Sequence, residues 1–270
     1  MFFVCPKCKK PLTKKIGCAV CSDGHSYDES KYGYYNFLLS QVGGVHGDNK
    51  EMVEARRSFL EGGYYSPLAE AVTELVIKHT RSGGQILDAG CGEGYYTERI
   101  HRAVTERDGE PHIAIFDISK EAVRRAKRRI PTAEACVASC YSMPIADGSL
   151  DTVVNIFSPL AEGEVHRVLK PEGKFIVAVP DAEHLFGLKS VLYETPYKNV
   201  IQEKAPEGFS EVERVRVRYT ITLDTKEAIH SLFMMTPYAY RTNEAGRRRL
   251  DAMESLVTEA DFTVFVYQRK

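Results

Sequence analysis

Residues 86–96 combine an apolar run with closely spaced glycines, in the order Ile-Leu-Asp-Ala-Gly-Cys-Gly-Glu-Gly-Tyr-Tyr. The spacing of Gly90, Gly92 and Gly94 predicts a tight turn between a strand and a helix, where a ligand can approach the backbone because no Cβ blocks it. The turn differs from the G-x-G-x-x-G of dinucleotide-binding proteins, because its third glycine comes one residue early. Asp88 would suit a ligand with a cationic end, such as the amino group of a methionine moiety.

A second acidic residue, Asp117, ends the next apolar run, 23 residues past Gly94. A carboxylate at the tip of such a strand can accept hydrogen bonds from ribose hydroxyls. Because ligands in α/β folds sit at the carboxyl ends of the strands, the glycine turn and Asp117 are expected to face one crevice. The glycines alone would also fit a plain tight turn, so the spaced Asp117 favours a nucleotide-type ligand.

Four of the seven cysteines lie in the first 21 residues, as Cys5-x-x-Cys8 and Cys18-x-x-Cys21, and His25 follows. Two C-x-x-C turns would supply thiolates with the bite that tetrahedral zinc requires. A redox role is disfavoured, because such a motif belongs beside a βαβ unit. Five candidates compete for four positions, and spacing does not decide between Cys18 and His25. A complete shell leaves no open position for chemistry, so the predicted zinc is structural.

The elements that must position these residues alternate along the second part of the chain. Short β runs separated by amphipathic stretches predict parallel βαβ units with helices on both faces, which is a doubly wound α/β fold. Residues 213–223 alternate strictly and residues 263–267 form a last β run, so these two are expected to finish the sheet antiparallel. The parallel strands are expected near residues 85–89, 112–117, 135–138, 151–157 and 174–179.

Composition divides the 270 residues into three parts. Residues 1–40 are the expected zinc-binding lobe, too small to fold on an apolar core alone. Residues 41–80 form a joint with glycines at positions 43, 44 and 47, then a helical pattern that Gly62-Gly63 and Pro67 should interrupt. Residues 81–270 form the ligand-binding α/β domain.

The bulk properties exclude several classes of protein. A formal net charge of −1 argues against a polyanion-binding surface over the whole protein, but not against local basic patches. The N-terminus lacks the basic and apolar regions of a signal peptide, and no apolar run approaches the length of a membrane span. We therefore expect a cytoplasmic protein that does not enter a membrane.

Two further segments resemble the fourth- and fifth-strand signatures of class I S-adenosylmethionine methyltransferases. They read Asp-Gly-Ser-Leu-Asp-Thr-Val-Val at residues 147–154 and Glu-Val-His-Arg-Val-Leu-Lys-Pro-Glu-Gly-Lys at residues 164–174. With the glycine turn, this resemblance covers roughly residues 83–180. It implies a Rossmann-like sheet that binds S-adenosylmethionine through Asp88, Gly90, Gly92, Glu93, Gly94 and Asp117.

Motifs along nearly the whole chain resemble the bacterial ribosomal RNA guanine-N1 methyltransferases, which act on a hairpin of the large-subunit (23S) RNA. Those motifs include Cys21-x-x-x-His25-Ser-Tyr-Asp, Gly33-Tyr-Tyr-Asn-Phe, Arg56-Arg-Ser-Phe-Leu, Gly63-Tyr-Tyr-Ser-Pro-Leu and Met235-Thr-Pro-Tyr. The resemblance implies ribosomal RNA as substrate and a homodimer. It implies Cys5, Cys8, Cys21 and His25 as zinc ligands, and Tyr65, Gly92, Glu93 and His184 as cofactor contacts.

Guanine N1 carries a proton at neutral pH, so a base or water must remove it during methyl transfer. Asp181, just past the fifth strand, is a candidate, although its position also suits the N-cap of the next helix, an alternative that we favour slightly. His184 is better explained as a cofactor contact than as a base. Asn155 is a catalytic candidate by its position at the fourth strand, where many family members carry a different residue.

Three basic stretches could contact phosphate. The lysines of the lobe are the favoured RNA contact, the arginines of residues 124–129 are expected to form a solvated helix face, and those of residues 214–218 fit RNA binding or a guarded sheet edge equally well. The lobe lysines are Lys7, Lys9, Lys10, Lys14 and Lys15. A small-molecule methyltransferase with an accessory zinc lobe is the alternative enzyme, and an RNA-binding adaptor with a vestigial cofactor domain is the non-enzymatic one.

Overall fold

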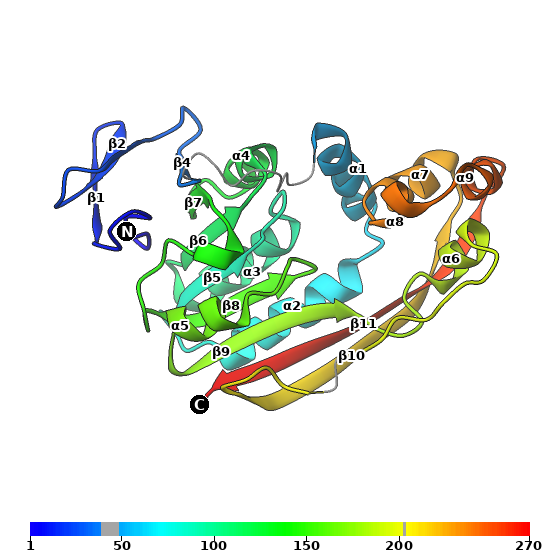
Figure 1. The fold of residues 1–270 in the computed structure, drawn as a ribbon. Helices are drawn as coiled ribbons and strands as arrows, with labels where there is room; N and C mark the ends of the chain where they lie inside the picture. Colours follow the sequence, from blue (N-terminus) through cyan, green and yellow to red (C-terminus); the bar gives the residue numbers. More distant parts are fainter. Residues whose placement is uncertain (39–48, 202–203) are drawn as a thin grey trace.

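The computed structural model of the protein describes residues 1–38, 49–201 and 204–270 (Figure 1). It consists of a twisted central sheet with helices packed on it, a small lobe of strands at the N-terminus, and a helical arm at the opposite end of the sheet. The predicted glycine joint at residues 43, 44 and 47 lies outside the described residues.

The central sheet confirms the doubly wound α/β fold, with the strand order β10-β11-β9-β8-β5-β6-β7-β4. Its strands are β4 (Tyr35–Asn36), β5 (Gln85–Ala89), β6 (His112–Asp117), β7 (Glu134–Val137), β8 (Leu150–Ile156), β9 (Leu169–Pro180), β10 (Phe209–Leu223) and β11 (Leu256–Arg269). The pairs from β4 to β9 are parallel, and β11 lies antiparallel between β9 and β10. The predicted antiparallel finish of the sheet is therefore confirmed.

Helices connect most of these strands. They are α1 (Lys50–Glu61), α2 (Ser66–His79), α3 (Tyr95–Asp108), α4 (Lys120–Arg129), α5 (Glu162–Val168), α6 (Phe186–Leu192), α7 (Lys226–Met234), α8 (Tyr238–Arg241) and α9 (Glu244–Asp251). The expected interruption at Pro67 is wrong, because Pro67 lies in the first turn of α2, where a missing N–H loses no hydrogen bond. The break between α1 and α2 falls instead at residues 62–65, which include the predicted glycine pair.

The two faces of the sheet are covered in different ways. Helices α2, α3 and α4 pack their apolar sides on one face. The other face carries α5, but the connection from β7 to β8 contains only the 3-10 turn η1 (Cys140–Ser142) instead of a crossover helix. The N-terminal lobe covers the face there: Phe3, Leu12 and Phe37 belong to the same buried cluster as Phe116 of β6.

The lobe itself is a three-stranded antiparallel sheet of β1 (Leu12–Lys15), β2 (Cys18–Cys21) and β3 (Ser26–Asp28). It is joined to the central sheet by β4, which the sequence pattern did not predict and which adds a parallel strand next to β7. The N–H of Phe37 donates to the carbonyl of Val137 at 2.9 Å, and the N–H of Val4 donates to that of Pro144 at 2.8 Å. The N-terminal segment is therefore hydrogen-bonded both to β7 and to the connection that precedes β8.

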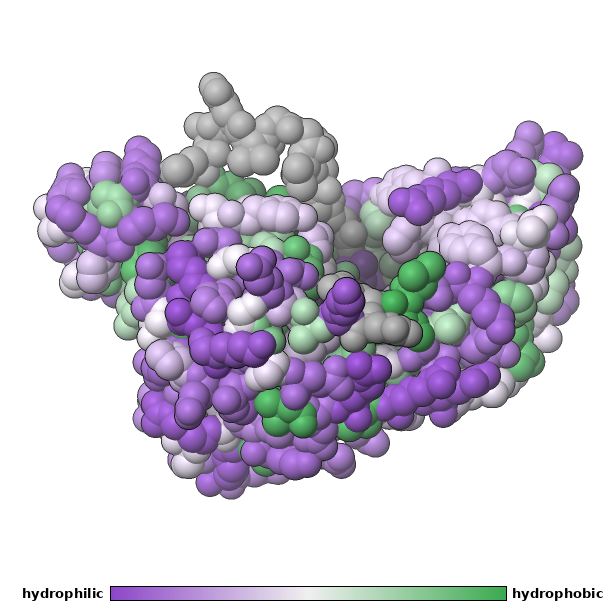
Figure 2. Space-filling model, turned by 60° about the horizontal axis from the view of Figure 1, so that its bottom comes forward, coloured by the Kyte–Doolittle hydropathy of each residue, from purple (hydrophilic) through white to green (hydrophobic). Residues whose placement is uncertain are grey.

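The arm, which comprises α7, α8 and α9, lies beyond the carboxyl end of β10, on the long hairpin of β10 and β11 (Figure 1). Helix α1 packs against α7, and α6 packs against α9, so the arm is held from both sides. Hydrophilic residues predominate on the face shown in Figure 2, with apolar ones scattered among them. Within the described ranges, no helix has the length and apolar character needed to cross a membrane.

Candidate active site and metal centre

The glycine turn connects β5 to α3, as predicted. All three glycines have positive φ, at 90° for Gly90, 56° for Gly92 and 88° for Gly94. A Cβ on Gly94 would lie 3.1 Å from Cα of Ala126, and one on Gly90 would lie 2.1 Å from Oγ of Ser158. A Cβ on Gly92 would meet no atom of the described chain within 4 Å. Two glycines thus permit close packing, whereas Gly92 marks the open side of the turn.

Asp117 lies at the carboxyl end of β6 and faces this open side. Its Oδ2 accepts a hydrogen bond from the N–H of Gly92 at 3.0 Å, and its Oδ1 accepts one from the N–H of Ser119 at 2.8 Å. A carboxylate at the carboxyl end of this strand is placed as in other nucleotide-binding α/β domains, where it accepts hydrogen bonds from ribose hydroxyls. The structure therefore brings the glycine turn and Asp117 together at one edge of the sheet, and their exposed groups suit a nucleoside.

Asp88, at the end of β5, is buried beneath the turn. Its Oδ2 accepts a hydrogen bond from Oγ1 of Thr97 at 2.5 Å. Burial raises the pKa of Asp88 to about 7; the Thr97 bond opposes this shift, and the nearby Asp117 adds to it. A buried carboxyl with such a pKa gains from a cationic ligand group, which would stabilise its ionised form.

The side chain of Glu93 is buried and paired with α4. Its Oε2 forms an ion pair with Nη2 of Arg129 at 2.8 Å, and its Oε1 is buried without a hydrogen-bond partner among the described residues. Burial raises the pKa of Glu93, and the charge of Arg129 opposes that shift. The ion pair with Arg129 fixes the glycine turn to α4.

Tyr65 and His184 meet across the site from different elements, Tyr65 before α2 and His184 after β9. The Tyr65 hydroxyl lies 3.4 Å from Nε2 of His184, and the N–H of Asp261 donates to Nδ1 of His184 at 3.4 Å. Nδ1 is thus an acceptor, which places the ring proton on Nε2. Burial, with Lys189 nearby, lowers the pKa of His184 to about 3. The imidazole is neutral and a weak base, as its interpretation as a contact residue requires.

The two catalytic candidates lie at the ends of adjacent strands, β8 and β9. Asn155 is buried, and its Nδ2 donates to the carbonyls of Ala89 at 3.2 Å and Pro159 at 3.5 Å. Asp181 is also buried; it accepts bonds from the N–H of Ala182 at 2.6 Å and from the hydroxyl of Thr263. The favoured N-cap interpretation of Asp181 is wrong, because the N-cap of α6 is Leu185.

Three cysteine sulfur atoms and one imidazole converge in the lobe. The ligand atoms of Cys5, Cys8, Cys21 and His25 all lie within 4.8 Å of one another. Sγ of Cys8 and Cys21 are 3.6 Å apart, and Nδ1 of His25 is 3.3 Å from Sγ of Cys21. A tetrahedron with Zn–S bonds of about 2.3 Å has sulfur atoms roughly 3.8 Å apart, so this set fits zinc.

Cys18 is not part of this cluster, so the fourth ligand position belongs to His25 and not to Cys18. Cys18 and Cys21 are the first and last residues of β2, and strand residues three apart point to opposite faces. Only Cys5-x-x-Cys8 is therefore a metal-binding turn. Regular β structure, and not a second turn, carries Cys21 into the site.

The basic helix α4 differs from the expected solvated face. Arg129 pairs with Glu61 of α1 and Glu98 of α3 in addition to Glu93. The guanidinium of Arg128 lies over the ring of Tyr32 in the lobe, 4.8 Å from its centroid. The helix therefore ties the lobe, α1 and the glycine turn together. The sequence gives no sign of these contacts, because ion pairs between distant elements leave no local pattern.

The lobe lysines divide into two groups. Lys10 pairs with Asp23 at 2.5 Å and Lys14 pairs with Glu29 at 3.0 Å. The side chains of Lys7, Lys9 and Lys15 are exposed and form no ion pair with any residue that the structure describes. On β10, Arg216 forms a two-pronged bond with buried Asp261, at 2.9 and 2.8 Å, which is a structural role.

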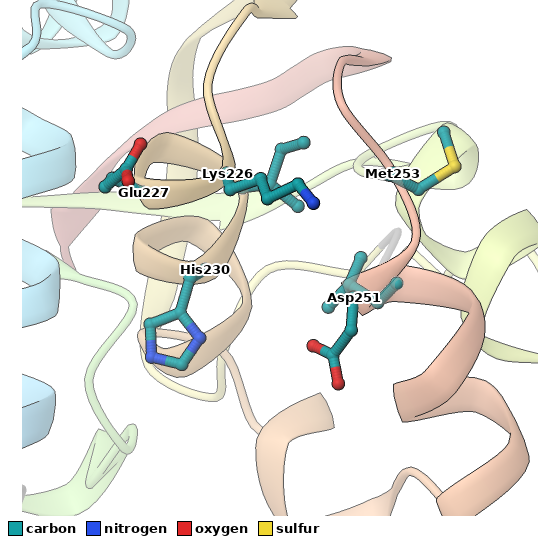
Figure 3. Close-up of a pocket in the computed structure, with 7 residues that line it drawn as sticks. Lys226, Glu227, His230, Asp251 and Met253 are labelled. Atoms are coloured by element: carbon teal, nitrogen blue, oxygen red, sulfur yellow. The ribbon is translucent and has the colours of Figure 1, made fainter.

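A separate hollow lies in the arm, on elements that carry none of the predicted site residues. Figure 3 shows Lys226, Glu227 and His230 projecting from α7, with Asp251 and Met253 on the opposite side. Lys226 pairs with Glu254 at 2.9 Å. The hollow therefore lies apart from the glycine turn and Asp117.

Known proteins match both parts of the chain. A family model described as "RlmA, N-terminal", a zinc ribbon, matches residues 3–42, and a methyltransferase domain model matches residues 80–233. The putative 23S rRNA (guanine-N(1)-)-methyltransferase YxjB of Bacillus subtilis is 34% identical over 98% of this chain and 94% of its own length. The 23S rRNA (guanine(748)-N(1))-methyltransferase of Streptomyces fradiae is 30% identical over 96% of this chain and 95% of its own.

A third relative, from Micromonospora griseorubida, is named putative 23S rRNA (guanine-N(1)-)-methyltransferase and is 32% identical over 94% of this chain and 91% of its own length. The methyltransferase domain implies S-adenosylmethionine as the methyl donor, and the zinc ribbon with its converging cysteines and histidine implies structural zinc. Near-complete coverage at this identity shows the family. The chain belongs to the 23S rRNA (guanine-N1)-methyltransferases.

Proposed function

We propose that the protein transfers a methyl group from S-adenosylmethionine to N1 of one guanine in a hairpin of 23S ribosomal RNA. The observation that carries this proposal is the similarity of the whole chain, lobe included, to relatives named for that reaction. A small-molecule methyltransferase would share the sheet and the glycine turn, but it would not need the zinc ribbon.

The geometry supports a cofactor site along the carboxyl ends of β5, β6 and β8. In this proposal Gly92, on the open side of the turn, lies against the nucleoside, and Asp117 accepts its ribose hydroxyls. The carboxylate of Asp88 binds the methionine ammonium, and the hydrogen bond from the Thr97 hydroxyl stabilises the ionised form of that carboxylate. Gly90, Gly94 and Glu93 shape the turn from behind, and Tyr65 and His184 close the site opposite.

In the reaction, bound S-adenosylmethionine supplies a methyl group on a sulfonium centre, which N1 of guanine takes in line. N1 loses its proton, and S-adenosylhomocysteine leaves. The amide nitrogen of Asn155 donates to two carbonyls, so we propose that its Oδ1 accepts a hydrogen bond from the target base. Asp181 is the carboxylate proposed to take the proton, directly or through water.

The lobe is proposed to hold zinc through Cys5, Cys8, Cys21 and His25, and to contact RNA phosphates through its exposed lysines. Division of the chain at residues 40 and 80 remains a proposal, as do a homodimer and a cytoplasmic location. Sedimentation of the purified protein tests the dimer, and fractionation of expressing cells tests the location.

The experiment that tests the function is tritiated methyl transfer to 23S RNA from a strain that lacks such an enzyme. Primer extension should then stop at one guanine, because N1-methylation blocks Watson–Crick pairing. RNA already methylated by the enzyme is the matched control and should accept no further label. A label on a small metabolite, or on an adenine or cytosine, would contradict the proposal.

A further inference from the structure

Phe157 directly follows β8 and has an unusual backbone conformation. Its φ is 56°, in the left-handed region that bulky residues rarely adopt. Such conformations persist only where the surrounding structure enforces them, and they concentrate at functional sites. Here the enforcing contacts are the Asn155 bond to the Pro159 carbonyl at 3.5 Å and the packing of Ser158 over Gly90.

The strained backbone turns the Phe157 ring partly out of the core. The side chain is 44% exposed, whereas Tyr65 and Phe262 beneath it are buried. Its ring centroid lies 5.4 Å from that of Phe262 and 6.5 Å from that of Tyr65. Aromatic residues therefore support the ring from one side, and the remainder is open to solvent.

A polar group without a partner lies in the same aromatic cluster. The ring of Tyr96 is 6.5 Å from that of Phe157, in an edge-to-face arrangement. The Tyr96 hydroxyl is buried and has no hydrogen-bond partner among the described residues. Buried hydroxyls are almost always hydrogen-bonded, so the Tyr96 hydroxyl is a candidate partner for a polar atom of a ligand.

The place of Phe157 determines which ligand it would meet. It lies two residues after Asn155, whose amide reaches the carbonyl of Ala89 at the head of the glycine turn. Its neighbour Ser158 packs against Gly90, so Phe157 lies beside the glycine turn. A base that is drawn out of an RNA stem loses its stacking partners, and protein aromatic rings commonly replace them.

We propose that Phe157 is the platform on which the target guanine stacks, with the Tyr96 hydroxyl bonding to its polar edge. This assignment rests on the proposed function, because it takes a guanine as the methyl acceptor. Phe157 positions the base; it transfers no proton and contacts no leaving group. The ring supports any base, so it supplies affinity and orientation and leaves the choice of base to hydrogen bonds.

The test compares binding of two RNA hairpins, one with the target guanine and one with an abasic site at that position. Wild-type protein should bind the guanine hairpin more tightly. In Phe157→Ala this preference should fall by roughly 10- to 100-fold, the scale of a single base–aromatic stack. Methylation should show a raised KM for RNA, while S-adenosylmethionine affinity, measured by calorimetry, stays unchanged.

Three further variants keep the result decisive. Phe157→Tyr retains a stacking face and should restore the preference, whereas Phe157→Leu fills similar apolar volume and should not. Tyr240→Ala removes an exposed aromatic ring from the arm and should leave the preference for guanine intact. Full activity of Phe157→Leu, equal weakening of both hairpins, or loss of cofactor binding would overturn the assignment. Failure of the wild-type protein to methylate any guanine would instead overturn the proposed function.

Discussion

Arg129, the last residue of α4, reaches Glu93 in the glycine turn, with Nη2 2.8 Å from Oε2. The same guanidinium contacts Glu61 at 2.5 Å and Glu98 at 2.7 Å. One largely buried cation thus joins three carboxylates from α1, α3 and the turn between β5 and α3. The conformation of the proposed cofactor site depends on a residue that does not line it.

Replacing Arg129 by Met should leave Glu93 buried without its cation. Loss of one partner of a buried pair typically costs about 3–5 kcal/mol. We expect a lower free energy of unfolding in urea and S-adenosylmethionine binding weakened by roughly tenfold. Arg128→Met is the matched control, since Arg128 is exposed and lies over Tyr32. Equal cofactor affinity in the two variants would show that the ion pairs of Arg129 do not determine the conformation of the glycine turn.

Asp88 should make the unliganded protein less stable as the pH rises. Its pKa is raised from 3.8 to about 7, so the neutral carboxyl stabilises the fold fully below pH 3.8, and this contribution is lost as the pH rises through 7. Between pH 5 and pH 8 the wild type should lose about 2–3 kcal/mol relative to Asp88→Asn, which cannot ionise. Urea unfolding of both proteins at the two pH values measures this difference.

The same carboxyl should make cofactor binding depend on pH. If Asp88 binds the methionine ammonium, S-adenosylmethionine affinity of the wild type should rise between pH 6 and pH 8, as Asp88 ionises. Asp88→Asn should bind weakly at both values. Parallel pH profiles for the two proteins in calorimetry would assign the ammonium to another group.

The metal site should hold one zinc ion per chain, and the bound zinc should stabilise the whole protein and not the lobe alone. Metal analysis should show loss of zinc in His25→Ala and retention in Cys18→Ser, because Cys18 points away from the cluster. Structural zinc contributes about 10 kcal/mol of binding free energy or more. Since the lobe shares a buried cluster with β6, chelation should lower the melting temperature of the whole protein. A lobe that melts separately, with the main transition unchanged, would contradict this coupling.

The exposed lobe lysines should set the salt dependence of RNA binding. Replacing Lys7 and Lys15 by Gln should weaken binding to the hairpin and reduce the slope of log affinity against log salt by about 0.7–0.9 for each RNA phosphate that is no longer neutralised. Cofactor affinity should not change. The control is the double variant Lys174→Gln with Lys270→Gln, which has the same change in charge. Lys174 lies in β9 and Lys270 directly follows β11, so neither belongs to the lobe. Identical slopes for the two double variants would exclude the lobe as the phosphate-binding surface.

The strands and the glycine turn could be predicted because their causes are local. Apolar runs such as residues 113–116 are buried in parallel strands, and the glycine spacing requires a turn with positive φ. Residues 35–36 could not be recognised as a strand. Two residues carry no periodicity, and β4 exists because the edge of β7 offers hydrogen-bonding partners.

The site shows the same distinction. Asp117 and the metal-binding turn at Cys5 and Cys8 follow from spacing alone. The position of Cys18 depends on β2 being regular, and the surroundings of Asp181 depend on Thr263 of β11, a strand 82 residues away along the chain. Contacts of this kind form only when distant segments pack, so no local sequence signal predicts them.

The pairing of β4 with β7 fixes the position of the lobe relative to the central sheet. A lobe on a free tether could carry an RNA stem to many positions, whereas one built into the sheet holds it at a fixed distance from Asn155. If the lobe binds RNA phosphates as proposed, the distance from the lobe to Asn155 would determine which nucleotide of the stem reaches the site. The choice of target would then depend on the length of RNA stem between the phosphates bound by the lobe and the hairpin loop. Adding one base pair to that stem should move methylation to a neighbouring nucleotide or abolish the reaction.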